Sequence, residues 1–400
     1  MNSKPTVGVF FGGRNPEHDV SIITGQLIVS GLKKLGHAVV PIYIGQDGVW
    51  YSGDKLGELK FFTSESRNLK GLDEIFLDMK SSRGKIVFKK SGLFGGTVTI
   101  DIAFPALHGQ FGEDGTLQGM FEMLDVPYVG SGVAGSAIAM DKYLTKKFFE
   151  SGGDDIHGKP VHPTTRFFVQ GKSTWDENPE SLIEAWDAKL GYPMFVKPAR
   201  LGSSIGVAKV RNRDELKRAL EVAYHYDTSV IAEEAIEDVM DVTCAVLQRN
   251  GDLMTSKLQE STFAADLLSY DDKYLKEGGT QLGGSKKSIV IPASLDEKTT
   301  ADIKLCALNI FIELRLSGTA RIDYLYDRTA KKWYVNEINT MPGTLYHHLW
   351  KESGVELPEL LTILLETAEW EHKRKNSVTR TFKSKLMDLA KSEKLRIKGS

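Results

Sequence analysis

The chain has 400 residues, of which 41% are hydrophobic and 26% charged, and its formal net charge is −2. These values describe a soluble globular protein of two or three domains and exclude an overall attraction to nucleic acid or to an anionic membrane. The sequence has no run of about twenty apolar residues and opens without a signal-peptide pattern, so we expect a cytoplasmic protein. Cys244 and Cys306 stand far apart in apolar stretches, which predicts buried, reduced thiols.

The first predicted domain is an α/β unit over residues 1–130. Apolar runs at 7–11 and 39–44 flank an amphipathic stretch at 20–35, and this strand, helix, strand order predicts a parallel sheet. The remaining predicted elements of this domain are strands at 101–107 and 126–129 and a helix at 116–124.

Two further domains and a tail are predicted. The central one, 131–236, is expected to contain helices at 136–150 and 214–224 and strands at 194–199, 207–210 and 230–235. The next, 237–370, is expected to contain strands at 243–248, 288–291, 321–326 and 333–338 and helices at 301–314 and 357–370. Residues 371–400 are lysine-rich and weakly periodic, which predicts a solvated terminal helix or basic tail.

Charged residues recur on two short β-rich runs near the carboxyl end. Arg321 and Asp323 are two apart on one run, and Glu337 and Asn339 are two apart on the other, so each pair shares a strand face. Carboxylate and amide oxygens are ligands that Mg²⁺ prefers, and they leave positions for phosphate oxygens. The pattern predicts a metal-nucleotide site; two ordinary hairpin strands with surface charges are the alternative.

A lysine before a glycine-serine loop is the second pattern. Lys197 ends a predicted strand just before the loop 200–206, where glycine amides and the hydroxyls of Ser203 and Ser204 suit phosphate oxygens. Lys142 begins a predicted helix and is expected to reach the same phosphates. The loop is neither a Walker A motif nor a dinucleotide fingerprint, because no G-K-[ST] and no G-x-G-x-x-G is present there.

The remaining candidate binding residues are three acidic residues near the end of one predicted strand and two residues in loops that follow predicted strands. Glu233 and Glu234 close a predicted strand shortly before Asp241; such a strand suits adenine and ribose, although a charged strand end explains it equally. Glu17 and His108 each follow a predicted strand of the first domain, at the edge where open α/β sheets bind ligands. Glu17 suits a substrate ammonium, whereas His108 taken singly is more readily a structural histidine than a ligand-binding one.

Seven motifs occur in a consistent order between residues 7 and 365 and together resemble the D-alanine:D-alanine ligase family of the ATP-grasp superfamily. They are G-G-x-x-x-E-H-D-V-S from Gly12, H-G-x-x-G-E-D-G-x-x-Q-G from His108, M-D-K from Met140, V-K-P-x-x-x-G-S-S-I-G from Val196, K-Y at Lys273, R-I-D from Arg321 and E-I-N-T-M-P-G from Glu337. The resemblance implies a three-domain ATP-grasp fold, in which a Rossmann-like amino-terminal domain precedes two α+β domains that sandwich ATP.

The resemblance also implies a role for each matching residue. Those assigned to ATP are Lys142, Lys197, Ser204, Glu233, Glu234, Ile236, Asp241 and Lys273. Those assigned to two Mg²⁺ ions, for which Mn²⁺ can substitute, are Asp323, Glu337 and Asn339. Those assigned to the D-alanines and the reaction are Glu17, Ser203, Tyr274, Arg321 and Gly343, with His108 and His348 as further substrate contacts.

The implied reaction joins two D-alanines through a D-alanyl phosphate, releases ADP and phosphate, and supplies peptidoglycan precursor. A homodimer without nucleic-acid or membrane partners is implied as well. Two positions depart from the family pattern: Asp241 is shorter than the usual glutamate, and His348 replaces a serine that helps to bind the second substrate's carboxylate. Tyr274 favours D-alanine over D-lactate.

Three alternatives stay open. A ligase of the same mechanism with D-lactate, D-serine or another acceptor is favoured by His348. A nucleotide-dependent oxidoreductase would explain the opening strand, but it gives Asp323, Glu337 and Asn339 no use. A non-catalytic ATP-grasp protein would be expected to lose its metal ligands early, yet all three are present.

Overall fold

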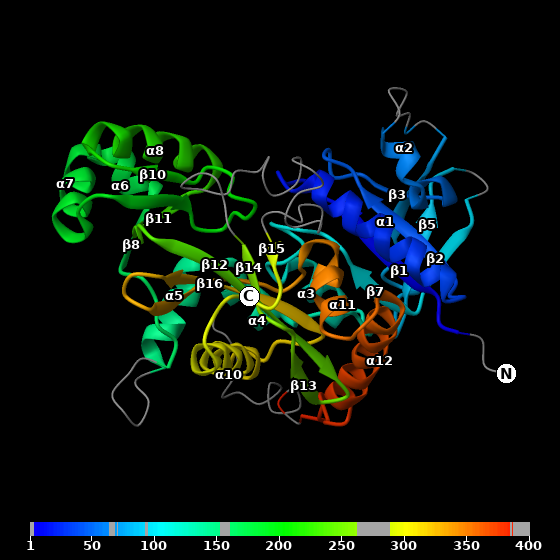
Figure 1. The fold of residues 1–400 in the computed structure, drawn as a ribbon. Coiled ribbons are helices and arrows are strands. Elements are labelled where there is room, and N and C mark those ends of the chain that lie inside the picture. Colours follow the sequence, from blue (N-terminus) through cyan, green and yellow to red (C-terminus); the bar gives the residue numbers. More distant parts are fainter. Residues whose placement is uncertain are drawn as a thin grey trace.

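The computed structural model describes residues 4–63, 69, 71–92, 95–152, 161–261, 289–384 and 386. Its strands form three sheets, one in each successive part of the chain (Figure 1). None of the helices in these described ranges is long and apolar enough to cross a membrane.

The amino-terminal part contains a seven-stranded sheet of order β6-β5-β4-β3-β2-β1-β7. Its strands are β1 (Val7–Gly12), β2 (Val39–Ile44), β3 (Trp50–Ser52), β4 (Asp73–Leu77), β5 (Ile86–Lys90), β6 (Thr97–Ile100) and β7 (Ile102–Pro105). The associated helices are α1 (His18–Lys34), the 3₁₀ turn η1 (Asp54–Gly57), α2 (Leu59–Thr63) and α3 (Thr116–Met123). The continuous apolar run of β1 is fully buried, as a central strand covered on both faces requires.

The predicted parallel pairing is confirmed for β1 with β2 and for β1 with β7, and β3 to β6 extend the sheet by antiparallel pairing. One expectation for this domain was wrong. The run 126–129 forms a single bridge between Ala103 and Tyr128 and not a strand. Pro127 has no N–H to extend the ladder, although its carbonyl oxygen accepts from Ala103.

The central part begins with two helices, α4 (Val133–Met140) and α5 (Lys142–Ser151), where one helix over 136–150 was expected. Asp141 separates them: its backbone is extended and its carboxylate accepts from the amides of Tyr143 and Leu144. This N-cap starts a new helix at Lys142.

An antiparallel four-stranded sheet of order β10-β9-β11-β8 follows, with its helices on one side (Figure 1). The strands are β8 (Phe167–Gly171), β9 (Met194–Pro198), β10 (Ala208–Val210) and β11 (Ser229–Glu234). The helices are α6 (Lys172–Glu177), α7 (Pro179–Leu190) and α8 (Arg213–Tyr226).

The carboxyl-terminal part contains a six-stranded antiparallel sheet of order β15-β14-β12-β16-β17, with β13 paired to β12. Its strands are β12 (Val239–Arg249), β13 (Asp252–Thr255), β14 (Gln259–Ser261), β15 (Ile289–Val290), β16 (Thr319–Asp327) and β17 (Lys332–Asn339). Its helices are α10 (Glu297–Glu313), the 3₁₀ turn η3 (Gly343–Tyr346), α11 (His347–Glu352) and α12 (Leu357–Asn376).

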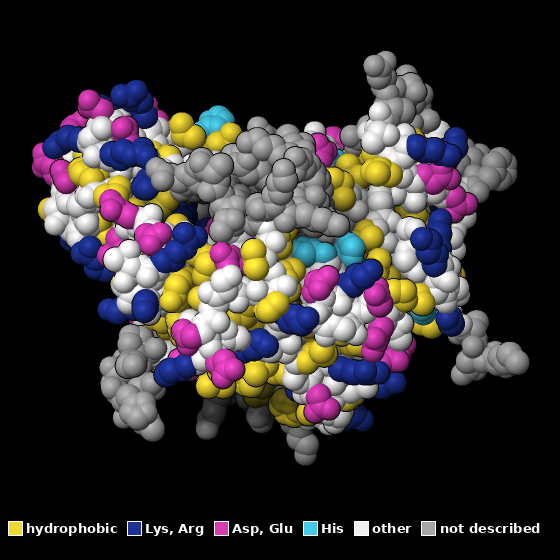
Figure 2. Space-filling model, in the orientation of Figure 1, with side chains coloured by type: hydrophobic (Ala, Val, Ile, Leu, Met, Phe, Trp, Pro, Cys, Tyr) yellow, Lys and Arg dark blue, Asp and Glu magenta, His cyan; other side chains and the backbone are white. Residues whose placement is uncertain are grey.

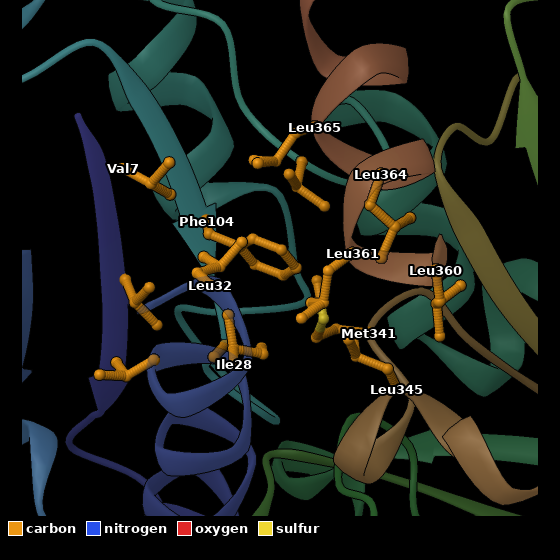
Figure 3. Packing of buried hydrophobic residues seen from close by; sticks show 14 of the residues in the cluster. Val7, Ile28, Leu32, Phe104, Met341, Leu345, Leu360, Leu361, Leu364 and Leu365 are labelled. Atoms are coloured by element: carbon orange, nitrogen blue, oxygen red, sulfur yellow. The ribbon is translucent and has the colours of Figure 1, made fainter. Parts of the chain in front are cut away.

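One hydrophobic cluster joins the first and last parts of the chain. Side chains of β1, α1 and β7 face leucines of α12 and residues of the loop before it (Figure 3). A Cβ at Gly31 of α1 would lie 2.4 Å from Cδ1 of Leu361 in α12, so any larger residue there would force the Leu361 side chain to shift. The loop after β17 is thereby held against the amino-terminal sheet, which brings site residues from both ends of the sequence together.

Helix α12 continues beyond Trp370 to Asn376, although the change in composition predicted a solvated segment from 371. Lys375 pairs with Glu122 at the end of α3, and His372 Nε2 lies 3.2 Å from Asp125 Oδ1. The basic last turn of the helix is stabilised by acidic partners and by the helix dipole.

The surface carries both signs of charge. Lysine or arginine and aspartate or glutamate side chains alternate over the lobe of α7 and α8 (Figure 2). Arg213 and Lys217 of α8 there pair with Glu180 of α7.

Candidate active site

The residues predicted for the metal site converge on β16 and β17. The strand register pairs Arg321 with Asn339 and Asp323 with Glu337. Arg321 donates from Nη2 to Asp323 Oδ2 at 2.6 Å and from Nε to Oδ1 at 2.9 Å. Asn339 Nδ2 donates to Asp323 Oδ2 at 3.1 Å. Glu337 Oε1 lies 4.0 Å from Nη2 of the Arg321 guanidinium. Strand alternation therefore placed all four side chains correctly.

Among the described residues, no three His, Cys, Asp or Glu side chains form a metal cluster, so a metal here would bind two carboxylates and one amide. Asp323 and Glu337 are four-fifths buried, and Asn339 keeps a carbonyl oxygen beside them. This hard oxygen set fits Mg²⁺, which completes its coordination with water and phosphate oxygens. In the structure Arg321 and Lys142 balance the two carboxylates, the latter with Nζ 3.7 Å from Glu337 Oε2.

The two predicted phosphate lysines approach β17 at neighbouring positions. Lys142, at the start of α5, donates to the Leu201 carbonyl at 2.8 Å in addition to its contact with Glu337. Lys197, on β9, donates to Asn336 Oδ1 at 3.3 Å. Asn336 falls at a register shift between β16 and β17, which leaves it outside the ladder. Both ammonium groups thus lie next to the carboxylate and amide set.

The strand end predicted to hold adenine contains a buried ion pair that the sequence did not reveal. Lys146 Nζ lies 3.1 Å from Glu233 Oε2, and Lys197 Nζ lies 3.2 Å from Glu233 Oε1. Thr165 accepts from Lys146 and donates to Glu233, each at 2.9 Å. Burial alone would raise the pKa of Glu233, but the two lysines lower it to about 2.

The other residues predicted for the nucleotide lie around this strand end. Arg166 donates to Glu234 through its side chain at 2.6 Å and its amide at 2.8 Å. Ile236 follows β11 and is partly exposed, and Asp241 lies on β12, also partly exposed. Both glutamates thus already have partners in the protein.

Glu17 lies between two glycine-containing loops. Its Oε1 accepts from Ser203 Oγ at 2.5 Å, while no described residue donates to its buried Oε2. A Cβ at Gly202 or Gly109 would come within 2.8 or 2.5 Å of the carboxylate. Burial, and then the charge of Glu113, raise the pKa of Glu17.

Ser203 and the next residue adopt a left-handed backbone, with φ of 56° at Ser203 and 57° at Ser204. Successive left-handed residues turn amides to one side of a loop, which suits anion binding. The predicted phosphate loop therefore carries unusual backbone geometry at both serines.

A hydrogen-bonded chain connects His108 to the loop that contains Gly343. His108 Nε2 lies 2.8 Å from Thr24 Oγ1, which accepts from the Thr344 amide at 3.0 Å. Glu113 binds the amides of Gly109 at 2.9 Å and Met341 at 3.1 Å. His108 is thus both near the site and a structural link.

His348 begins a second chain of contacts, which runs through Gln259 and Tyr346 to Arg321. Its Nε2 lies 2.8 Å from Gln259 Oε1, and Gln259 Nε2 donates to the Tyr346 hydroxyl at 2.8 Å. The Arg321 guanidinium carbon is 4.9 Å from the centre of the Tyr346 ring.

A small cavity lies where the three parts of the chain meet. Its walls come from α1, the loop before α3, α4, α5, the glycine-serine loop and β17, and they include Glu17, Glu113, Lys142, Gly202, Glu337 and Asn339. Lys273 and Tyr274 lie outside the described residues. Lys146, Thr24, Glu113 and Gln259 were not predicted; only Glu113, inside the H-G-x-x-G-E-D-G motif, had a sequence signal.

Comparisons with known proteins decide the family. Residues 6–131 match the family model for the D-ala D-ala ligase N-terminus, and residues 160–366 match the model for its C-terminus. The chain belongs to the D-alanine–D-alanine ligase family. The D-alanine–D-alanine ligase of Geobacillus kaustophilus is 35% identical over 95% of this chain and 99% of its own length. That of Chloroherpeton thalassium is 36% identical over 92% and 97%.

Solved structures of the family have the same fold. The D-alanine–D-alanine ligase of Coxiella burnetii has a TM-score of 0.74 at 28% identity, covering 94% of this chain and 97% of its own. The VanG D-Ala:D-Ser ligase of Enterococcus faecalis has a TM-score of 0.73 at 29% identity, covering 92% and 100%. The ATP-grasp architecture predicted from the motifs is thereby confirmed.

Proposed function

We propose that this protein is an ATP-dependent ligase that joins two D-alanines and releases ADP and phosphate for peptidoglycan precursor synthesis. The observation that carries the proposal is the convergence of Glu17, Lys142, Gly202, Glu337 and Asn339 on one cavity from three parts of the chain. A family member that had lost activity would be expected to lose this convergence first.

Glu17 binds the ammonium group of the first D-alanine. Its buried Oε2 lacks a donor among the described residues, and burial, followed by the charge of Glu113, raises its pKa, so a nearby cation would stabilise the carboxylate. A bound ammonium supplies both the charge and the donor. Ser203, already hydrogen-bonded to Glu17, and Tyr274 complete this set, and His108 supports the loop beside it.

Lys142 and Lys197, together with Ser204 and Lys273, bind the ATP phosphates. Glu233, Glu234 and Ile236 bind adenine and Asp241 binds the ribose. Because both oxygens of Glu233 are engaged by Lys146, Lys197 and Thr165, its carboxylate is oriented before the nucleotide arrives. Such orientation lowers the entropic cost of binding.

Asp323, Glu337 and Asn339 would hold two Mg²⁺ ions, which would supply positive charge for the phosphates and the transferring phosphoryl group. The first D-alanine carboxylate attacks that phosphoryl group and becomes an acyl phosphate. ADP leaves in that step. The amine of the second D-alanine then attacks the acyl carbon and loses its proton to solvent, the oxyanion is stabilised by Arg321 and the Gly343 amide, and the C–O bond to phosphate breaks so that phosphate leaves. Burial of Arg321 keeps this positive charge away from water.

We propose in addition that the enzyme is a cytoplasmic homodimer, since ATP is its substrate and the family resemblance implies a dimer. Size-exclusion chromatography with light scattering tests the dimer independently of activity.

Phosphate release by the purified protein with ATP, Mg²⁺ and D-alanine tests the ligase, with the product identified by mass. Release that depends on D-alanine and yields D-alanyl-D-alanine is the expected result. The control contains L-alanine instead. Absence of phosphate release under all these conditions would overturn the proposal.

A further inference from the structure

The turn η3 ends in three consecutive residues with left-handed backbone geometry. Thr344, Leu345 and Tyr346 have φ values of 49°, 55° and 50°, and none of them is glycine. Residues with a side chain rarely adopt this region, and they keep it only where the surrounding structure holds them there. The three residues directly follow Gly343, whose amide is assigned to the oxyanion in the proposed mechanism. The contacts that hold this turn can therefore affect the reaction.

The left-handed run is held at both ends by side chains from other elements. At its start, the hydroxyl of Thr24 in α1 accepts from the Thr344 amide at 3.0 Å, and this hydrogen bond is buried. At its end, the Tyr346 hydroxyl lies 2.8 Å from Gln259 Nε2 in β14. Helix α1 and strand β14 thus hold the turn from two directions.

Helix α1 connects the first D-alanine subsite to this turn. Glu17 immediately precedes the helix, and the completely buried Thr24 comes seven residues later, two turns along the same face. One further turn along, Ile28 belongs to the same hydrophobic cluster as Met341 and Leu345 (Figure 3). The helix therefore contacts the turn through one hydroxyl group and through apolar packing.

We propose that Thr24 is a positioning residue for acyl transfer, because it fixes the peptide unit between Gly343 and Thr344 and so orients the Gly343 amide toward the oxyanion. The inference rests on the ligase function proposed above. A Cβ built on Gly343 would meet no atom within 4 Å, so this residue borders open space in which a substrate can lie. A donor stabilises an oxyanion best when it already points to the place where the charge develops. Loss of the Thr24 hydroxyl should therefore slow the attack of the second amine more than it weakens the binding of ATP or of the first D-alanine.

Thr24 has a second partner, which gives the inference a specific alternative. His108 Nε2 lies 2.8 Å from the same hydroxyl, and His108 supports the loop beside the first subsite. If the contact with His108 were the important one, loss of the hydroxyl would raise the KM for the first D-alanine. If the contact with Thr344 is the important one, the loss lowers the rate of dipeptide formation and leaves that KM unchanged.

The test replaces Thr24 with valine, which has nearly the same shape but no hydroxyl. We expect the single-turnover rate of D-alanyl-D-alanine formation, measured by rapid quench, to fall about tenfold, the effect of one hydrogen bond. The KM values for ATP and for the first D-alanine should stay unchanged. Positional isotope exchange at the β,γ-bridging oxygen of ATP reports reversible formation of the acyl phosphate, and its rate should be retained. Retained exchange also shows that the variant is folded.

Two further variants make the result specific to the hydroxyl of Thr24. Thr24→Ser keeps the hydroxyl and should keep the wild-type rate. Thr367→Val is the matched control for loss of a buried hydroxyl, because Thr367 in α12 is 1% exposed and donates to the Gln248 carbonyl at 2.9 Å. Thr367 is not among the residues that line the active-site cavity, so its replacement should lower stability without slowing dipeptide formation.

The possible outcomes separate this inference from the ligase assignment. An unchanged rate in Thr24→Val, or an equal fall in Thr367→Val, would overturn the inference. A raised KM for the first D-alanine with an unchanged rate, or a parallel loss of isotope exchange and dipeptide formation, would overturn it as well. Absence of D-alanine-dependent turnover in the wild-type enzyme would overturn the ligase assignment instead.

Discussion

Replacing Lys146 with methionine should destabilise this protein strongly, although Lys146 belongs to no recognised motif. The Lys146 and Glu233 side chains are 1% and 2% exposed, and their charged atoms are 3.1 Å apart. Methionine retains most of the aliphatic volume but leaves Glu233 with one charged partner fewer. The cost arises because a carboxylate without full compensation is unfavourable inside a protein.

The expected size of the effect follows from what remains around Glu233. Removing one partner of a buried ion pair costs about 3 to 5 kcal/mol. Lys197 Nζ stays 3.2 Å from Glu233 Oε1 and Thr165 still donates to Glu233, so compensation is only partly lost. We therefore expect about 3 kcal/mol, the low end of that range.

Urea denaturation followed by tryptophan fluorescence measures this loss as a shift of the unfolding midpoint. The matched control is Lys147→Met at the adjacent position. Lys147 pairs with Glu150 at 2.7 Å, but both side chains are about half exposed, so its removal should leave the midpoint unchanged. Equal midpoints for the two variants would refute the argument that burial makes the difference.

The pH dependence of the free energy of unfolding tests the same ion-pair argument. The pKa of Glu233 in the folded state is lowered from 4.5 to about 2, so its ionised form stabilises the fold above pH 4.5 and this contribution is lost as pH falls towards 2. In Lys146→Met the pKa of Glu233 must rise, because one of the two lysines that lower it is gone. The difference in stability between the variant and wild type should therefore be largest at neutral pH and should shrink as pH falls below about 4.5 towards 2; a constant difference between pH 7 and pH 2 would contradict the ion-pair explanation.

Three further substitutions test the site and the fold. Glu337→Gln should lower turnover more than about 100-fold while ATP still binds, because an amide is a weaker Mg²⁺ ligand; full turnover would refute the metal assignment. Gly202→Ala places a Cβ within 2.8 Å of Glu17, so the KM for the first D-alanine should rise while nucleotide binding, measured by calorimetry, stays the same; an unchanged KM would remove Glu17 from the first subsite. Gly119→Ala, on helix α3 with open space around the added Cβ, should instead raise stability by about 0.5 to 1 kcal/mol, and a loss measured by urea denaturation would contradict this.

The sequence was sufficient to predict which side chains lie together wherever the local geometry of a strand determines this. Two-residue spacing on β16 and β17 brought Arg321, Asp323, Glu337 and Asn339 to one place, as the register confirms. The helix break at Asp141 was missed, because one continuous helix over 136–150 was predicted, although aspartate is a common N-cap. The antiparallel strands β4 to β6 were missed because they are short and carry several charged or polar residues.

Contacts between residues far apart in the chain could not be predicted from the sequence. Nothing near Lys146 indicates that its partner is Glu233, and nothing near His348 indicates that its partner is Gln259. Likewise, α12 looked like an ordinary amphipathic helix, whereas it shares a core with β1 and α1. Such pairings depend on how sheets and helices pack, and periodicity within one element does not encode them.

The charges of the site explain how two carboxylates can lie side by side before any substrate binds. Asp323 and Glu337 are paired across β16 and β17, and their mutual repulsion is offset by Arg321 and Lys142, which contact them directly. These are the same two cations that the mechanism assigns to the oxyanion and to the phosphates. A divalent cation that took over the carboxylates would release both groups for those tasks, because each would lose its counter-charge to the metal. In the proposed mechanism, one set of cations stabilises the protein before substrate binds and then acts on the substrate, which accounts for the contacts of Arg321 with Asp323 and of Lys142 with Glu337.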